Sequence, residues 1–243
     1  MAITAEMKMA DVIHSNIQLL SVIQGLNIKL GFREKSVSEI CAEQDVDVNF
    51  FLQLTNVYNN EDYFPSQELL NFPVNWIVEY LRNTHHCLVH YRIPDIERQI
   101  TDIEAELSGQ VKNIDLLLKF FKDYIKEFNT HIELEEKMVF PYVLTLNQLI
   151  NKELELKDIN PKVIRYTIDK YTEDHNDIEE KLYDLKSILL KYLPPPPNNY
   201  KYNNLVYEIF RLESDLNDHS KMEERVLIPK VEQMEKEYYQ QNK

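Results

Sequence analysis

Glycine is scarce in this chain, with only three glycines among 243 residues. No GxGxxG or phosphate-loop pattern occurs, although parallel α/β nucleotide-binding folds depend on such Gly-rich turns. The scarcity of glycine, together with abundant Leu, Ile, Glu and Lys, favours helix. We therefore expect an all-α protein.

Positive charge is also in deficit, with 27 basic against 41 acidic residues and a formal net charge of -14. This balance argues against nucleic acid or an anionic membrane as the main partner, because both need a basic face. No apolar run approaches the ~20 residues of a membrane-spanning helix. The N-terminus lacks the basic and apolar regions of a signal peptide, so the expected location is the cytoplasm.

Cysteine is limited to Cys41 and Cys87, which form neither a CxxC motif nor a zinc-ribbon spacing. Two free, buried thiols are the commoner arrangement in a reducing compartment. We therefore expect neither a disulfide framework nor a cysteine-rich metal site.

Residues 1–60 are predicted to form a small N-terminal domain of three helices. Apolar residues at helical spacing predict the first helix over about 8–25. Ser36 and Glu39 form a capping box that opens the second helix. Asp47 caps the third.

Residues 61–72 read as a linker, and residues 73–243 as a second domain. Four long helical segments are predicted there, with the four prolines Pro194–Pro197 between the third and the fourth. Their joins are short enough for an antiparallel four-helix bundle. The segments begin and end near residues 74–106, 113–151, 161–192 and 203–239.

Two segments of the bundle share one pattern, His-x3-Glu-x5-Pro. The first runs from His131 through Glu135 to Pro141, and the second from His219 through Glu223 to Pro229. Residues four apart on a helix lie on the same face. Each segment therefore directs an imidazole and a carboxylate at a common point, a combination that suits iron, zinc or manganese.

Each of the four predicted bundle helices carries a histidine near its middle. Four histidines and two glutamates are too many for one tetrahedral zinc ion, and they suit two ions bridged by carboxylates. Open or exogenously bridged positions would remain at those ions for small molecules such as O₂, NO or peroxide. The predicted metal ligands are His86, His131, Glu135, His175, His219 and Glu223.

Other nearby side chains are weighed against this set. His90 lies four residues after His86 and is a candidate fifth histidine ligand. Glu179 forms a third His-x3-Glu pair, but a solvated helix face explains it better. His85, which points about 100° away from His86 on a helix, is expected outside the site, and Glu136 is expected to face another direction.

The two His-x3-Glu-x5-Pro segments resemble the hemerythrin-like fold. Three further stretches narrow the resemblance to the iron-sulfur cluster repair di-iron proteins, and residues 6–58 resemble the small N-terminal domain of that family. The stretches are Ile93-Pro94-Asp95-Ile96 after His86, Asp174-His175-Asn176-Asp177, and Pro194–Pro197.

This resemblance implies the same six ligands, with Glu135 and Glu223 bridging two non-haem iron ions (Fe2+/Fe3+) that share an oxo or hydroxo group. It implies a cytoplasmic protein that repairs iron-sulfur clusters after nitrosative or oxidative stress. The implied partners are iron, NO, O₂ or peroxide, and iron-sulfur client proteins.

One departure from the family concerns its usual adjacent Cys-Cys pair. The matching stretch, residues 27–35, contains no cysteine, and Cys41 lies well downstream. Thiol-dependent iron delivery is therefore in doubt, and a docking or homodimer-forming role is left for the N-terminal domain.

Two other classes of function stay open at this point. One is an enzyme that reduces NO or peroxide at the di-iron centre, although no flavin motif supplies electrons. The other is a hemerythrin-type protein that binds or senses O₂ or NO, which a ligating His90 would favour. A structural bundle with zinc or without metal is the remaining alternative.

Overall fold

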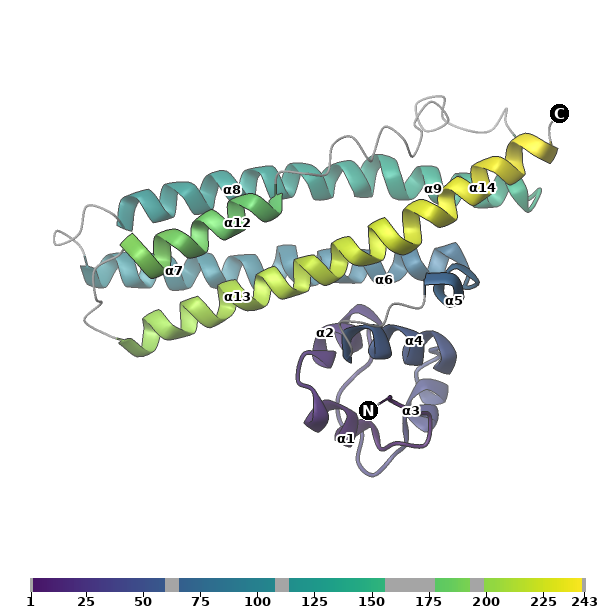
Figure 1. Ribbon diagram of the computed structural model, residues 1–243, viewed down its shortest axis with the longest axis horizontal. Coiled ribbons are helices and arrows are strands. Elements are labelled where there is room, and N and C mark those ends of the chain that lie inside the picture. Colours follow the sequence, from purple (N-terminus) through teal and green to yellow (C-terminus); the bar gives the residue numbers. More distant parts are fainter. Residues whose placement is uncertain (1, 60–65, 108–113, 156–177, 193–198, 242–243) are drawn as a thin grey trace. The chain divides into compact units, whose positions relative to one another are not determined.

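The computed structural model describes residues 2–59, 66–107, 114–155, 178–192 and 199–241 (Figure 1). Within these ranges the secondary structure is helical and contains no strand, which confirms the predicted all-α class. None of the helices in these ranges is long and apolar enough to cross a membrane. By its contacts the chain divides into two compact units, residues 1–84 with 221–243 and residues 85–220.

The N-terminal residues form four short helices instead of the predicted three. The predicted helix over 8–25 is split in two, because the Asn16 side chain accepts a hydrogen bond from the Gln18 backbone N–H at 3.0 Å. Such local side-chain bonds compete with the helical ladder. The helices are α1 (Met9–Ser15), α2 (Leu19–Gly25), α3 (Val37–Glu43) and α4 (Val48–Asn59), followed by α5 (Ser66–Leu70).

The predicted helix starts in this region are confirmed. The Ser36 hydroxyl accepts from the Glu39 backbone N–H at 3.2 Å, and the Ser36 N–H donates to the Glu39 carboxylate at 2.8 Å. This reciprocal pair is the capping box that begins α3. Asp47 accepts from the Phe50 N–H at 2.9 Å and caps α4.

In the N-terminal region, α2 and α3 are each followed by a non-glycine residue in the left-handed conformation. Asn27 follows α2 with φ 56°, and Asp45 follows α3 with φ 55°; Asn and Asp are the non-glycine residues that tolerate this region best. Gly25 serves a different purpose, because a Cβ at this position would lie 2.4 Å from the Tyr80 ring. Glycine at this position therefore lets the Tyr80 ring pack closely against the backbone of α2.

The long predicted helices are confirmed wherever they lie within the described residues. Each contains α-helix and one turn of π-helix, and the predicted ends that lie within the described residues match to within a few residues. The first run is α6 (Val74–Cys87), η1 (Leu88–Arg92) and α7 (Ile93–Leu107). The second is α8 (Ile114–Leu134), η2 (Glu135–Val139) and α9 (Phe140–Ile150). The third is described as α12 (Ile178–Ser187) and η4 (Ile188–Tyr192), and the fourth is α13 (Asn199–Met222), η5 (Glu223–Leu227) and α14 (Ile228–Gln241).

Proline explains three of these π turns. A proline inside a helix lacks an N–H and its ring clashes with the carbonyl four residues back. Pro94, Pro141 and Pro229 each lie two residues after a π segment, so the clashing carbonyl falls within that segment. The residue before each proline donates its N–H to the carbonyl five residues back. The widened turn thus relieves the clash.

The second unit, residues 85–220, is held together by one apolar core. In Figure 1, α7, α8, α12 and α13 lie alongside one another, and all four contribute buried side chains to this core. Its fully buried members include Ile96, Phe121, Leu185 and Ile209. The predicted domain boundary at residues 61–72 lies partly outside the described residues and stays a prediction.

Candidate metal centre

Four buried side chains form a cluster that has the chemistry of a metal site. They are His85 on α6, Glu135 at the start of η2, His219 on α13 and Glu223 at the start of η5. Each offers one ligand atom, and the four atoms lie within 4.8 Å of one another. Glu223 follows His219 by one turn on the same run of helix, as the His-x3-Glu spacing predicts.

Burial distinguishes this cluster from an ordinary charged surface. The two glutamates are 0% and 1% exposed, and His85 and His219 are 3% and 4% exposed. Buried charged groups are rare in proteins unless they are paired or bind a metal. Two carboxylates and two imidazoles with almost no solvent around them are therefore a candidate binding site for a cation.

The structure places His85, where the sequence favoured His86, beside the other three side chains of the cluster. His85 faces the cluster, with its Nε2 atom 3.0 Å from Glu135 Oε2 and 3.0 Å from His219 Nε2. His86 is exposed, and so is His90, against which it packs. The cause is the π turn that follows, because an extra residue in a turn rotates all preceding positions by about one residue, or 100°.

The two oxygens of Glu135 face different histidines. Oε1 lies 3.0 Å from His131 Nε2, and Oε2 lies 3.0 Å from His85 Nε2. Burial alone raises the pKa of this carboxyl, but hydrogen bonds and charge interactions with His131 and His85 outweigh it and hold the pKa well below the usual range. Glu135 is therefore a carboxylate, and both of its oxygens are directed at nitrogen donors.

Glu136 determines which nitrogen of His85 faces the cluster. Its carboxylate lies 2.9 Å from His85 Nδ1, and a carboxylate can only accept a hydrogen bond. His85 Nδ1 must then carry a proton, so release of the Nε2 proton would leave a lone pair there for a metal ion beside Glu135 and His219. Carboxylates hold metal-binding imidazoles in this way. The Phe140 ring stacks on His85 at 5.4 Å and covers its face.

Two of the separations between donor atoms are short enough for both atoms of each pair to bind one metal ion. Two ligands bound at right angles to one ion, each about 2.1 Å away, lie about 3 Å apart. The two 3.0 Å separations around His85 Nε2 match this edge. A mixed imidazole and carboxylate set suits iron or manganese as well as zinc.

The remaining predicted ligands have different outcomes. His131 lies beside the cluster through its contact with Glu135 and is 16% exposed. His175 and the Glu179 side chain lie outside the described residues, so both stay predictions. His90 lies on the exposed side of its helix and not in the cluster.

Sequence reasoning missed two residues of this region, His85 and Glu136. Helical phase separates adjacent residues by only 100°, so the choice between His85 and His86 depended on recognising the π turn. The signal available was Pro94, since a proline inside a predicted helix marks such an irregularity. Glu136 carried no comparable signal, because its partner lies on another helix.

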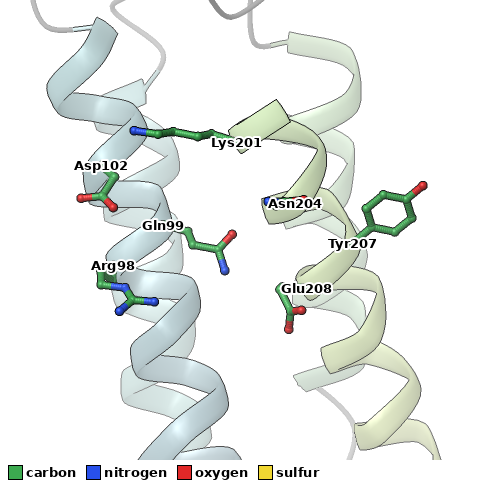
Figure 2. Close-up of a pocket in the computed structure, with 7 residues that line it drawn as sticks. All are labelled: Arg98, Gln99, Asp102, Lys201, Asn204, Tyr207 and Glu208. Atoms are coloured by element: carbon green, nitrogen blue, oxygen red, sulfur yellow. The ribbon is translucent and has the colours of Figure 1, made fainter. Parts of the chain in front are cut away.

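A separate pocket of about 480 Å³ opens between α7 and α13. Figure 2 shows Lys201 on α13 extending across to α7 and Gln99 on α7 pointing towards α13, with Tyr207 directed away. Basic and acidic side chains balance in its lining, and no histidine or cysteine is among them. It therefore lacks the imidazole and thiolate donors typical of a transition-metal site, and its lining carries no net charge that would select a ligand.

Comparison with known proteins adds one match. The family model described as Hemerythrin HHE cation binding domain matches residues 92–231, which is more than half of the chain. The matched range contains three of the four clustered residues, while His85 precedes it. No curated protein matches the chain.

Proposed function

The chain belongs to the hemerythrin HHE cation-binding domain family, whose domain binds metal, typically iron, and on that premise we propose that it is a non-haem di-iron protein that helps to repair iron-sulfur clusters. The observation that carries the metal assignment is the buried cluster of His85, Glu135, His219 and Glu223. These four residues, with His131, would hold the iron.

The arrangement of Glu135 supports two ions over one. Its Oε2 atom lies with His85 and His219, and its Oε1 atom lies with His131. A carboxylate with its oxygens directed at separate donor groups is suited to bridge two ions. His175, which lies outside the described residues, remains the predicted additional ligand beside His131.

Iron in such a site supplies Lewis-acid and one-electron redox chemistry towards small molecules such as NO, O₂ or peroxide. The chain's own residues contribute position and exclusion of water. Glu136 holds His85 in one tautomer. Phe140, fully buried, covers the His85 ring and keeps water from that side.

The role in cluster repair is supported by the sequence resemblance, including the small N-terminal helical region before the bundle. The absent Cys-Cys pair bears on how iron would be transferred, not on whether it is bound. Repair by direct donation of iron from the centre needs no thiol in the N-terminal domain, and this is the route we propose.

The first experiment measures iron. The full chain is purified without oxygen, loaded with Fe2+, freed of excess metal and analysed for iron per chain. We expect about two iron ions in the wild type and a loss in His219→Ala, with His14→Ala as a control because His14 is exposed. Absence of iron, or one zinc ion per chain, would contradict the di-iron assignment.

The second experiment tests repair. An aconitase-type enzyme whose cluster was damaged by NO is incubated with the iron-loaded chain, and its activity is followed. Recovery that depends on the loaded centre and fails with His219→Ala supports repair by iron donation. No recovery, with consumption of NO or peroxide when an electron donor is added, would replace repair with the reductase alternative.

A further inference from the structure

A pocket of about 310 Å³ lies within the first compact unit, residues 1–84 with 221–243. It opens where the ends of α2 and α3 and the beginning of α4 meet α6. Its charged lining residues are Asp45, Asp47 and Glu79, and the described residues that line it include no lysine, arginine or histidine. Unlike the balanced pocket between α7 and α13, this pocket therefore offers a ligand a net negative charge.

Two helices end at this pocket. Gly25 and Leu26 lie at the end of α2, and Gln44 and Asp45 lie at the end of α3. The last carbonyl groups of a helix carry partial negative charge and favour cations. The Asn83 side chain on α6 donates to one of them, the Gly25 carbonyl, at 2.9 Å. Helix ends and carboxylates thus act in the same direction and attract a positive group.

Aromatic side chains form another wall of the pocket. Trp76, the single tryptophan of the chain, and Phe50 both line it, and their ring centroids lie 5.8 Å apart. Phe72 stacks on Trp76 at 6.1 Å with 29° between the ring planes and holds the indole in place. Trp76 is only half-buried. It therefore keeps ring surface on which a flat cation can pack.

Carboxylates beside an aromatic ring suit a guanidinium group. The guanidinium is planar, so it stacks on a ring while its five N–H groups donate to carboxylates and carbonyls around its edge. A volume of about 310 Å³ admits a side chain but not a helix, which is about 10 Å across. The net charge of -14 also favours a basic partner. We propose that this pocket binds an arginine side chain of a partner protein and makes the N-terminal region a docking site for a basic segment.

Titration of an arginine peptide into the full chain tests the proposal. Trp76 fluorescence is the signal, because the chain has no other tryptophan. The probe is a capped peptide with one arginine between glycines, and its comparison is the same peptide with citrulline, which has a similar shape without the charge. We expect the arginine peptide to change the fluorescence and the citrulline peptide to bind at least about tenfold more weakly.

Two variants remove charge from the pocket and keep the shape of the side chain. They are Asp45→Asn and Glu79→Gln, and Asn tolerates the left-handed backbone that Asp45 adopts at φ 55°. Each should weaken binding of the arginine peptide about fivefold, the upper end for a partly exposed ion pair, and the double variant should weaken it more. The matched control is Glu6→Gln, which removes an exposed charge outside the pocket and should retain full binding.

Three results would overturn the proposal. Equal affinity for the arginine and citrulline peptides, or unchanged affinity in the double variant with helix content retained by circular dichroism, would show that the charge of the pocket selects nothing. Binding of free L-arginine as tight as that of the peptide would assign the pocket to a small ligand. The pocket and the metal cluster share no residue, so metal-free and iron-loaded chains should give the same titration, and failure of the iron assignment is seen separately.

Discussion

The two His-x3-Glu-x5-Pro segments, residues 131–141 and 219–229, have one pattern and different surroundings. In both, the glutamate is fully buried, begins a π turn and precedes a proline that accounts for that turn. In the first segment His131 contacts its own Glu135 at 3.0 Å, whereas in the second His219 contacts His85 from another helix at 3.0 Å.

This difference shows that the pattern determines the position of each carboxylate more firmly than the partner of each histidine. The spacing of four residues places His and Glu on one face whatever surrounds them. Which nitrogen meets which oxygen depends on the neighbouring helices. The first segment links two sets of donors through Glu135.

Removal of the linking carboxylate should have the largest effect. Glu135→Ala takes away a ligand from both donor sets, so we expect loss of essentially all iron, measured as iron per chain after gel filtration. His131→Ala should remove only the donor on one side and retain part of the iron. Glu133→Ala is the matched control, because Glu133 lies on the same segment and is exposed. Full iron in Glu135→Ala would contradict the bridging role.

Glu136 should have a smaller but measurable effect. Glu136→Gln replaces the carboxylate that holds His85 Nδ1–H with a neutral amide, and loss of such a partner typically lowers metal affinity about 10–100-fold. Competition with a chelator measures the affinity. Glu224→Gln, at the equivalent position of the second segment, tests whether the segments differ here, and an equal loss would contradict a role specific to His85.

The prolines should affect stability and metal binding in opposite directions. Pro141→Ala and Pro229→Ala each restore a backbone N–H and remove the ring that the widened turn accommodates, so the metal-free protein should gain on the order of 1 kcal/mol from the added hydrogen bond. The π turn then relaxes and the adjacent glutamate shifts, so iron affinity should fall. Urea unfolding and chelator competition measure the two effects. A variant that loses stability and keeps its iron affinity would show that the proline does not maintain the turn.

The acid sensitivity of the metal-free protein should be the smallest effect. The pKa of Glu135 in the folded chain lies well below its ordinary value of 4.5, so its ionised form stabilises the fold above pH 4.5. That contribution is lost as the pH falls through the lower, folded value. The free energy of unfolding should therefore decrease less on acidification in Glu135→Gln than in the wild type. Identical pH profiles would contradict this assignment.

Much of the fold was predictable because helix signals are local. The Ser36–Glu39 capping box and the Asp47 cap lie where the sequence predicts them, and the long helices match within a few residues where they are described. The split between α1 and α2 was missed, since it depends on one side-chain hydrogen bond at Asn16. Helix propensity and the spacing of apolar residues do not reveal such a hydrogen bond.

The sequence by itself determined the helical class, the family-specific pattern and the two buried glutamates, because spacing along a helix sets which residues share a face. Only the tertiary structure decided that His85 faces the centre, that Glu136 holds it and that His219 meets it. These outcomes depend on π turns and on contacts between residues far apart in the chain. The prolines of the repeated pattern mark the turns, but the pattern carries no information about the contacts between distant residues.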